Sequence, residues 1–176
     1  MNLPNKLTIA RVVAVPFFII AYMTDLFWIA LIIFVLASLT DMLDGQIARR
    51  RNLITNFGKI MDPLADKVLV YAALCLFIEN QTIQAWTLVI ILTREFAVAG
   101  MRAVAAAEGR VLAAGMSGKI KTVLQMFAVP LLILGQAIPQ NPWIMKVGYF
   151  VFWASMIMTV YSGAEYIYQN RDVFSM

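Results

Sequence analysis

Four aspartates stand close together in a chain that otherwise carries few charges. Asp41 and Asp44 lie three residues apart, and Asp62 and Asp66 lie four apart. On a helix, either spacing puts the paired side chains on one face, about 5–6 Å apart at their Cβ atoms. Carboxylates without histidine are the ligands that hard divalent cations prefer, and the chain contains no histidine and a single cysteine. The pattern therefore predicts a site for two Mg²⁺ or Mn²⁺ ions.

Two such ions would suit a reaction at phosphorus. Paired cations roughly 3.5–4 Å apart clamp phosphoryl oxygens during an in-line displacement. Structural roles explain these aspartates only one at a time. Asp62 stands before Pro63 and could be a helix cap. Asp41 could pair with a basic residue. Because no such role accounts for all four carboxylates, we favour the metal site.

The residues that follow Asp44 leave room for a ligand. Gly45 comes next and Ala48 three residues later, so this helix face is almost bare and could receive a nucleotide base or ribose. Arg49 is placed to bind a phosphate with its guanidinium group. Gly58 fits either this pocket or a simple turn.

Membrane-spanning helices are expected to position these residues. Of 176 residues, 62% are hydrophobic and 14% are charged, whereas soluble domains carry about 25% charged residues. The apolar blocks reach the roughly 20 helical residues that cross a bilayer. We therefore expect an all-α integral membrane protein, one domain over residues 1–176, with its first span retained rather than cleaved. Its six transmembrane helices are predicted near residues 8–25, 28–49, 58–79, 84–108, 118–137 and 143–168.

The second and third of these helices would bring the aspartates together. The two helices are consecutive and antiparallel, and a short loop joins them. Asp44 should lie about 9 Å above that loop, and Asp62 about one turn above it. The four carboxylates can then converge just below one membrane surface.

Basic residues predict that this surface is cytoplasmic. With the N-terminus inside, nearly all lysines and arginines fall at or near the cytoplasmic side, and Lys146 falls outside. Trp28, Trp86 and Trp143 then lie at outer ends of spans, as in an aromatic belt. Both termini are expected to be cytoplasmic. The net charge of +4 reflects orientation and attraction to anionic membrane lipids, and we expect no nucleic-acid partner.

The aspartates belong to a longer pattern, Asp41-x2-Asp44-Gly45-x2-Ala48-Arg49-x8-Gly58-x3-Asp62-x3-Asp66. It resembles the signature of the CDP-alcohol phosphatidyltransferases at every fixed position, and the resemblance covers essentially the whole chain. Members of this family use an alcohol to displace CMP from a CDP-linked lipid, with two divalent cations. The resemblance implies that all four aspartates are metal ligands, that Asp66 is also the general base, and that the protein is a homodimer. It assigns Gly45, Ala48 and Arg49 to the CDP moiety.

Other segments resemble one bacterial branch of this family. "NLPNKLTIAR", "TREFAVAGMR" and "MSGKIKTVLQM" are similar to the branch whose acceptor is glycerol 3-phosphate. That resemblance implies CDP-diacylglycerol as donor, phosphatidylglycerophosphate as product, and a place in the bacterial cytoplasmic membrane with the active site facing the cytoplasm. Asn5, Thr8 and Arg11 recur in the resemblance and are expected to line the nucleotide pocket.

A second group of basic residues supports an acceptor that carries a phosphate. These residues lie at the cytoplasmic ends of the fourth and fifth expected helices, beyond what metal neutralisation requires. Arg110 could equally serve orientation or contact anionic headgroups. Arg94 lies deeper, beside Glu95, but adjacent residues on a helix are not expected to face each other. The predicted phosphate ligands are Arg94, Arg102, Arg110, Lys119 and Lys121.

Other functions remain as alternatives. Myo-inositol phosphate would meet the same positive charges, whereas serine brings no phosphate and is disfavoured. A small cation transporter could also hold four aspartates in a membrane. Against it, the aspartates lie toward one membrane face, and neither broken helices nor an inverted repeat are evident.

Overall fold

The computed structural model contains helices and no strands among the residues that it describes. These residues are 3–50, 56–113 and 115–174 for the backbone and 8–40, 64–65, 67–113 and 115–173 for the side chains. The six predicted helices are confirmed as helices. The largest difference in their ends is at the N-terminus, where the first helix begins at Leu3 rather than near residue 8. A short C-terminal 3-10 helix was not predicted. The elements are α1 (Leu3–Met23), α2 (Phe27–Arg50), α3 (Asn56–Glu79), α4 (Ala85–Ala107), α5 (Met116–Ala137), α6 (Pro142–Gln169) and η1 (Arg171–Phe174).

Two helices meet the length and hydropathy of a membrane span. Among the described residues, α5 and α6 are long and apolar enough to cross a bilayer, and shorter apolar helices cover Thr8–Met23 and Phe27–Thr40. Aromatic side chains also face outward, and Phe96, Phe127 and Phe150 each expose more than 60% of their surface. Soluble monomers seldom expose large apolar patches, so this outer surface fits a lipid environment. That all six helices cross the membrane stays a prediction.

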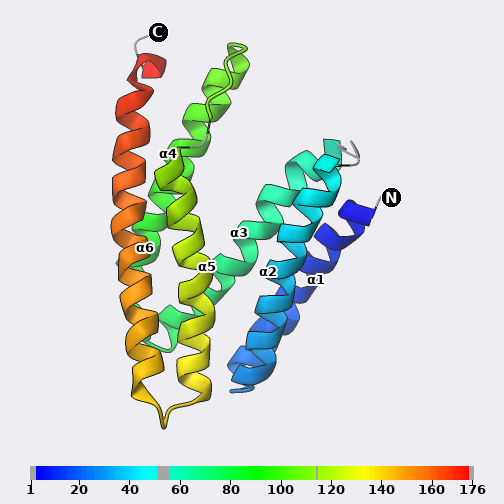
Figure 1. The fold of residues 1–176 in the computed structure, drawn as a ribbon, viewed down its shortest axis with the longest axis vertical. Coiled ribbons are helices and arrows are strands. Elements are labelled where there is room, and N and C mark those ends of the chain that lie inside the picture. The colour runs from blue at the N-terminus through cyan, green and yellow to red at the C-terminus, as the bar shows by residue number, and fades with distance from the viewer. Residues whose placement is uncertain (1–2, 51–55, 114, 175–176) are drawn as a thin grey trace.

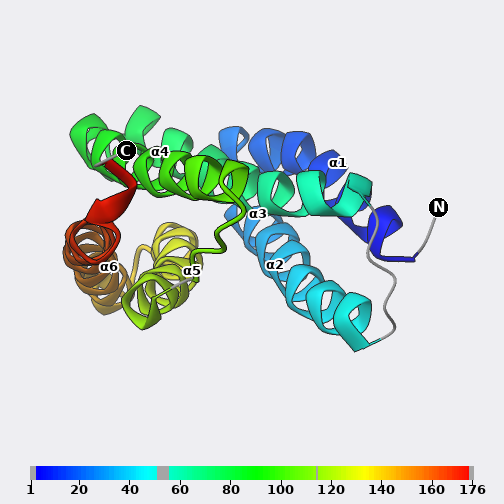
Figure 2. The same cartoon turned by 90° about the horizontal axis from the view of Figure 1, so that it is seen from above.

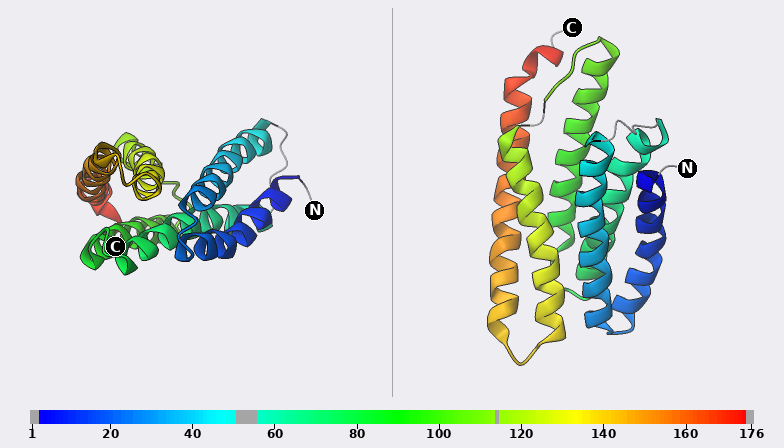
Figure 3. Two further views of the ribbon diagram at one scale, coloured as in Figure 1. Left: turned by 90° about the horizontal axis from the view of Figure 1, so that it is seen from below. Right: turned by 45° about the vertical axis from the view of Figure 1, so that its right-hand side comes forward.

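The helices run up and down between two ends of the molecule (Figure 1). Both ends of the chain, the end of α2, the start of α3 and the α4–α5 connection lie toward one end, and the other connections lie toward the opposite end (Figures 1 and 3). Helix α5 packs along α6, α1 contacts α2 and α3, α2 contacts α5, and α4 contacts α6. Seen from above, α1, α3 and α4 form a row, with α2, α5 and α6 on one side of it (Figure 2).

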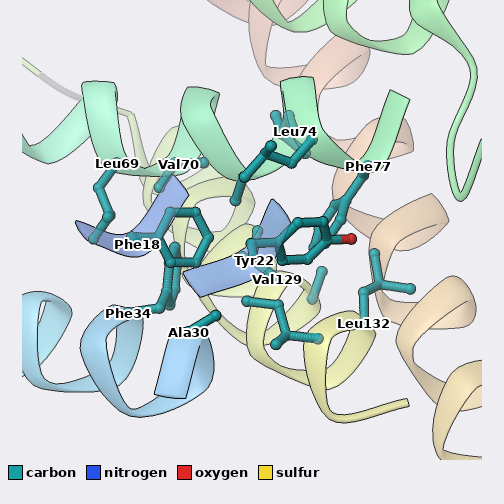
Figure 4. Packing of buried hydrophobic residues seen from close by; sticks show 14 of the residues in the cluster. Phe18, Tyr22, Ala30, Phe34, Leu69, Val70, Leu74, Phe77, Val129 and Leu132 are labelled. Atoms are coloured by element: carbon teal, nitrogen blue, oxygen red, sulfur yellow. The ribbon is translucent and has the colours of Figure 1, made fainter. Parts of the chain in front are cut away.

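An apolar core holds α2 and α3, the helices that carry the four aspartates. The ring of Phe18 on α1 lies 5.9 Å from that of Phe34 on α2. The ring of Tyr22, one turn further along α1, lies 5.8 Å from that of Phe77 on α3. Leu132 of α5 closes the cluster (Figure 4). All but Tyr22 among these side chains are less than 2% exposed, so this core fixes four helices relative to one another.

Hydrogen bonds tie the helices together at the end opposite to the termini. The Tyr22 hydroxyl donates to Gln136 Oε1 at 2.6 Å and accepts from Asn80 Nδ2 at 2.5 Å. Gln136 Nε2 in turn donates to Thr82 Oγ1 at 3.1 Å. The Tyr149 hydroxyl donates to the Thr82 carbonyl at 2.8 Å. This network therefore joins α1, α5 and α6 to the α3–α4 turn at this end of the bundle.

Candidate functional site

The backbone places the four aspartates on the two helices on which they were expected. Asp41 and Asp44 lie in the last turns of α2, and Asp62 and Asp66 lie in the first turns of α3. Both of these helix segments lie toward the same end of the bundle (Figure 3). The aspartate side chains lie outside those that the structure describes, so the predicted metal site stays a prediction. The same holds for the predicted nucleotide-binding side chains of Asn5, Gly45, Ala48, Arg49 and Gly58.

Two predicted nucleotide-binding residues are described, and both face inward. Thr8 and Arg11, on consecutive turns of α1, are 1% and 3% exposed. Arg11 Nε donates to the carbonyl oxygen of Ala37 on α2 at 3.3 Å. A buried guanidinium is costly unless it is hydrogen-bonded. Arg11 therefore fixes α1 against α2 at Ala37, one helical turn before Asp41.

A cavity of about 690 Å³, lined mainly by charged and polar residues, opens among α3, α4, α5 and α6. It lies toward the end of the bundle that holds both termini, because the first turns of α5 and the last turns of α6 form its wall. Its charged lining residues are Lys67, Arg94, Glu95, Arg102, Lys119 and Glu165, and its uncharged polar ones are Ser117, Thr122, Ser162, Tyr166 and Gln169.

Glu95 is the centre of the charges in this cavity. Its Oε1 lies 2.6 Å from Lys121 Nζ and 3.0 Å from Arg94 Nη1, and its Oε2 lies 2.8 Å from Lys67 Nζ. The carboxylate therefore joins α3, α4 and α5. The expectation that Arg94 and Glu95 do not face each other was wrong. Cβ atoms of adjacent helical residues point apart, but the long arginine side chain bends back to the carboxylate.

The structure brings three of the five predicted phosphate ligands to the cavity. Arg94, Arg102 and Lys119 line it. Arg94 Nε donates to Ser162 Oγ at 3.2 Å. Arg102 Nε donates to the Tyr166 hydroxyl at 3.1 Å, and its guanidinium carbon lies 5.3 Å from the centre of that ring. These contacts with α6 hold both arginines of α4 in place.

The other two predicted ligands lie elsewhere. The Lys121 side chain is 5% exposed, lies behind Glu95 and faces a smaller cavity. Arg110, in the α4–α5 connection, pairs with Asp172 of η1 at the surface. The hydrogen bond from Arg110 lowers the pKa of the Asp172 carboxyl below its usual value. The structure thus does not bring Arg110 to the cavity.

Several cavity residues were missed by the sequence analysis. Lys67 follows Asp66 directly, and that adjacency was the one available signal for it. Ser162, Tyr166 and Glu165 lie on α6, where nothing in their spacing marked them. Ser117 donates a hydrogen bond to Glu165 across the α5–α6 interface.

Positive charge exceeds negative charge on the cavity wall. Two lysines and two arginines face two glutamates, and one of these glutamates, Glu95, already pairs with cavity cations. Guanidinium groups fixed in one orientation can donate two parallel hydrogen bonds to a phosphate. The cavity can therefore bind a small phosphorylated molecule beside the helix that carries Asp62 and Asp66.

Comparisons with known proteins cover the chain nearly from end to end. The model of the CDP-alcohol phosphatidyltransferase family matches residues 1–161. A Bacillus subtilis relative is 42% identical over 186 residues, which cover 97% of this chain and 96% of the relative. A Rickettsia bellii relative is 38% identical (98% and 97% covered), and a Shigella flexneri relative is 34% identical (97% and 95% covered). All three are named CDP-diacylglycerol–glycerol-3-phosphate 3-phosphatidyltransferase.

Proposed function

Because the chain belongs to the CDP-alcohol phosphatidyltransferase family, we propose that it transfers the phosphatidyl group of CDP-diacylglycerol to glycerol 3-phosphate. The reaction releases CMP and forms phosphatidylglycerophosphate, a step of phospholipid biosynthesis. The observation that carries the choice of acceptor is the shared name of relatives that match nearly the full length of this chain. The surplus of positive charge in the cavity supports it, because glycerol 3-phosphate brings a phosphate that this charge can bind.

The aspartates supply the chemistry of the reacting phosphate. Asp41, Asp44, Asp62 and Asp66 fit two divalent cations, since the donor set contains only carboxylates. When bound, such cations stabilise negative charge on phosphoryl oxygens. Asp66 also takes the proton from the acceptor hydroxyl as this oxygen attacks the β-phosphorus of CDP-diacylglycerol. The new bond joins the acceptor oxygen to that phosphorus, and CMP leaves with the electrons of the broken bond.

Different helices bind the two substrates. Gly45, Ala48, Arg49 and Gly58 receive the CDP moiety, together with Asn5, Thr8 and Arg11 of α1. Arg94, Arg102 and Lys119 bind the acceptor phosphate in the cavity, and Lys121 supports its wall through Glu95. Arg11 bonds to Ala37 of α2, the helix that carries Gly45, Ala48 and Arg49, which supports the first assignment, and the cavity lining supports the second.

The setting of the reaction is a bacterial cytoplasmic membrane. The chain forms one domain with six spans, cytoplasmic termini and an active site that faces the cytoplasm, and it acts as a homodimer. Both termini lie toward one end of the bundle (Figure 1), and the lining residues put the cavity toward the same end, which supports this orientation. Basic residues concentrate toward that end, as the positive-inside rule requires.

An assay with three acceptors tests the proposal. Purified protein in detergent micelles would receive CDP-diacylglycerol, Mg²⁺ and radiolabelled glycerol 3-phosphate, myo-inositol phosphate or serine. We expect a labelled lipid and released CMP with glycerol 3-phosphate, and loss of both after chelation of the metal. Micelles have no membrane potential, so CMP release in them also argues against a transporter. Absence of lipid product from glycerol 3-phosphate would overturn the proposal.

A further inference from the structure

The side chain of Arg94 passes through a slot between α5 and α6 where both helices carry glycine. A Cβ atom placed on Gly163 would lie 2.9 Å from Arg94 Cγ, and one placed on Gly118 would lie 2.9 Å from Arg94 Nη2. Real Cβ atoms essentially never approach other atoms so closely. Any side chain at either position would therefore have to move the arginine.

These two glycines differ from those that serve close helix packing. At Gly135 the nearest atom is Met145 Cα of the neighbouring helix, at 3.0 Å, and at Gly148 the backbone nitrogen of Leu132 lies at 3.2 Å. At Gly118 the contact within 4 Å is the end of the Arg94 side chain, and at Gly163 both contacts are with Arg94 side-chain atoms. The missing side chains thus make room for one arginine rather than for a neighbouring helix.

The slot leaves the guanidinium with one orientation. Nε donates to Ser162 Oγ at 3.2 Å, and Nη1 donates to Glu95 Oε1 at 3.0 Å. Within the part of the chain that the structure describes, Nη2 has no hydrogen-bond partner; it lies beside Gly118, and both residues line the cavity. Hydrogen bonds thus hold Nε and Nη1, and Nη2 lies at the cavity wall.

We propose that Gly118 and Gly163 are positioning residues that fix Arg94 for the acceptor phosphate. The inference rests on the proposed function, since it assumes that a phosphorylated acceptor binds in this cavity. A guanidinium that is held in place loses little freedom when it binds a phosphate, so its position contributes to affinity. The glycines act through Arg94, which lines the acceptor cavity. Their substitution should therefore weaken acceptor binding and spare donor binding.

Alanine substitutions at the two positions test this role. In Gly118→Ala and Gly163→Ala we expect the KM for glycerol 3-phosphate to rise about tenfold, with kcat and the KM for CDP-diacylglycerol changed less than about threefold. Calorimetric binding of glycerol 3-phosphate should weaken in parallel. Gly118→Ala meets the flexible end of a side chain, so it should fold even if Gly163→Ala does not.

Two matched variants separate positioning from general damage. Gly100→Ala places a methyl group on the same helix as Arg94, with nothing within 4 Å, and should leave both KM values unchanged. Gly148→Ala pushes against the α5 backbone far from the cavity. It should lower thermal stability and activity without a selective rise in the KM for the acceptor.

A double substitution shows whether the glycine acts through the arginine. If it does, Gly118→Ala should add nothing to the effect of Arg94→Ala, because effects on one contact are not additive. Fully additive effects, or equal rises in both KM values, would overturn the inference. If Arg94→Ala raises the acceptor KM but the glycine variants behave like Gly100→Ala, the inference fails and the proposed function stands. No binding or turnover of glycerol 3-phosphate by the unmodified protein would refute both.

Discussion

Lys67 connects the two halves of the proposed site. It follows Asp66, the proposed base, and its ammonium group lies 2.8 Å from Glu95 Oε2 in the wall of the acceptor cavity. A change in the position of this segment of α3 would therefore move the base relative to the bound acceptor. A displacement of about 1 Å between reacting groups can lower the reaction rate about 100-fold. The ion pair of Lys67 with Glu95 therefore helps to keep the base in place relative to the acceptor.

Asp66→Asn tests the role of the base. The amide cannot take the proton of the acceptor hydroxyl, so kcat should fall by at least about 100-fold, the usual contribution of a general base. Binding of CDP-diacylglycerol should remain detectable in a filter assay, because three aspartates are unchanged. Asp25→Asn, in the exposed α1–α2 turn at the opposite end, is the matched control and should keep full activity. Normal turnover in Asp66→Asn would contradict the assignment.

The spacing of residues along the sequence predicted only those parts of the site that lie on one helix or on two consecutive helices. Asp41 and Asp44 could be grouped from sequence because helical geometry alone puts them on one face. The contact of Lys67 with Glu95 depends instead on how α3 packs against α4, which no local spacing encodes. The adjacency of Arg94 and Glu95 was misread because the rule describes Cβ directions, whereas a long side chain can fold back.

At the level of helices, hydropathy and turn residues predicted nearly all of the secondary structure. The apolar blocks are long and are separated by short polar breaks such as the one before Ala85, so each helix could be located closely. The helical segment before Thr8 contains Pro4, Asn5 and Lys6, so the continuous apolar run that marks the rest of the helix does not extend over it. The cavity could not be predicted, because it arises from the separation of α4 from α5 near their connected ends.

Glu95 holds α3, α4 and α5 together, and Glu95→Ala tests this role. The substitution leaves Lys121 buried without its partner, and breaking such a pair typically costs about 3–5 kcal/mol. We expect an unfolding transition at lower SDS concentration in mixed micelles. Adding Lys121→Met should recover most of the loss, since it removes the unpaired charge. Glu79→Ala, at the exposed end of α3, is the control and should be nearly neutral. Equal stability of Glu95→Ala and the unmodified protein would argue against a structural role.

The described part of the molecule has a charged cavity toward one end and a network of uncharged hydrogen-bonding side chains at the other. Tyr22, Gln136 and Thr82 join the helices at the end opposite to the termini, and the cavity lies toward the end with the termini. A membrane enzyme whose donor is a lipid and whose acceptor is water-soluble needs such an asymmetry. The acceptor can enter from the water on one side, and the donor can enter from the bilayer.

Cysteine labelling tests the orientation that this asymmetry predicts. In a background where Cys75 is replaced by alanine, Thr24→Cys and Gln140→Cys probe the α1–α2 and α5–α6 turns, and Val111→Cys probes the α4–α5 connection; all three positions are exposed. A membrane-impermeant maleimide should label the first two in intact cells and the third in inside-out vesicles, because basic residues keep the α4–α5 side in the cytoplasm. Labelling with the sides reversed would place the active site outside, away from the cytoplasmic acceptor. Labelling of positions 111 and 140 from the same side would mean that α5 does not cross the membrane.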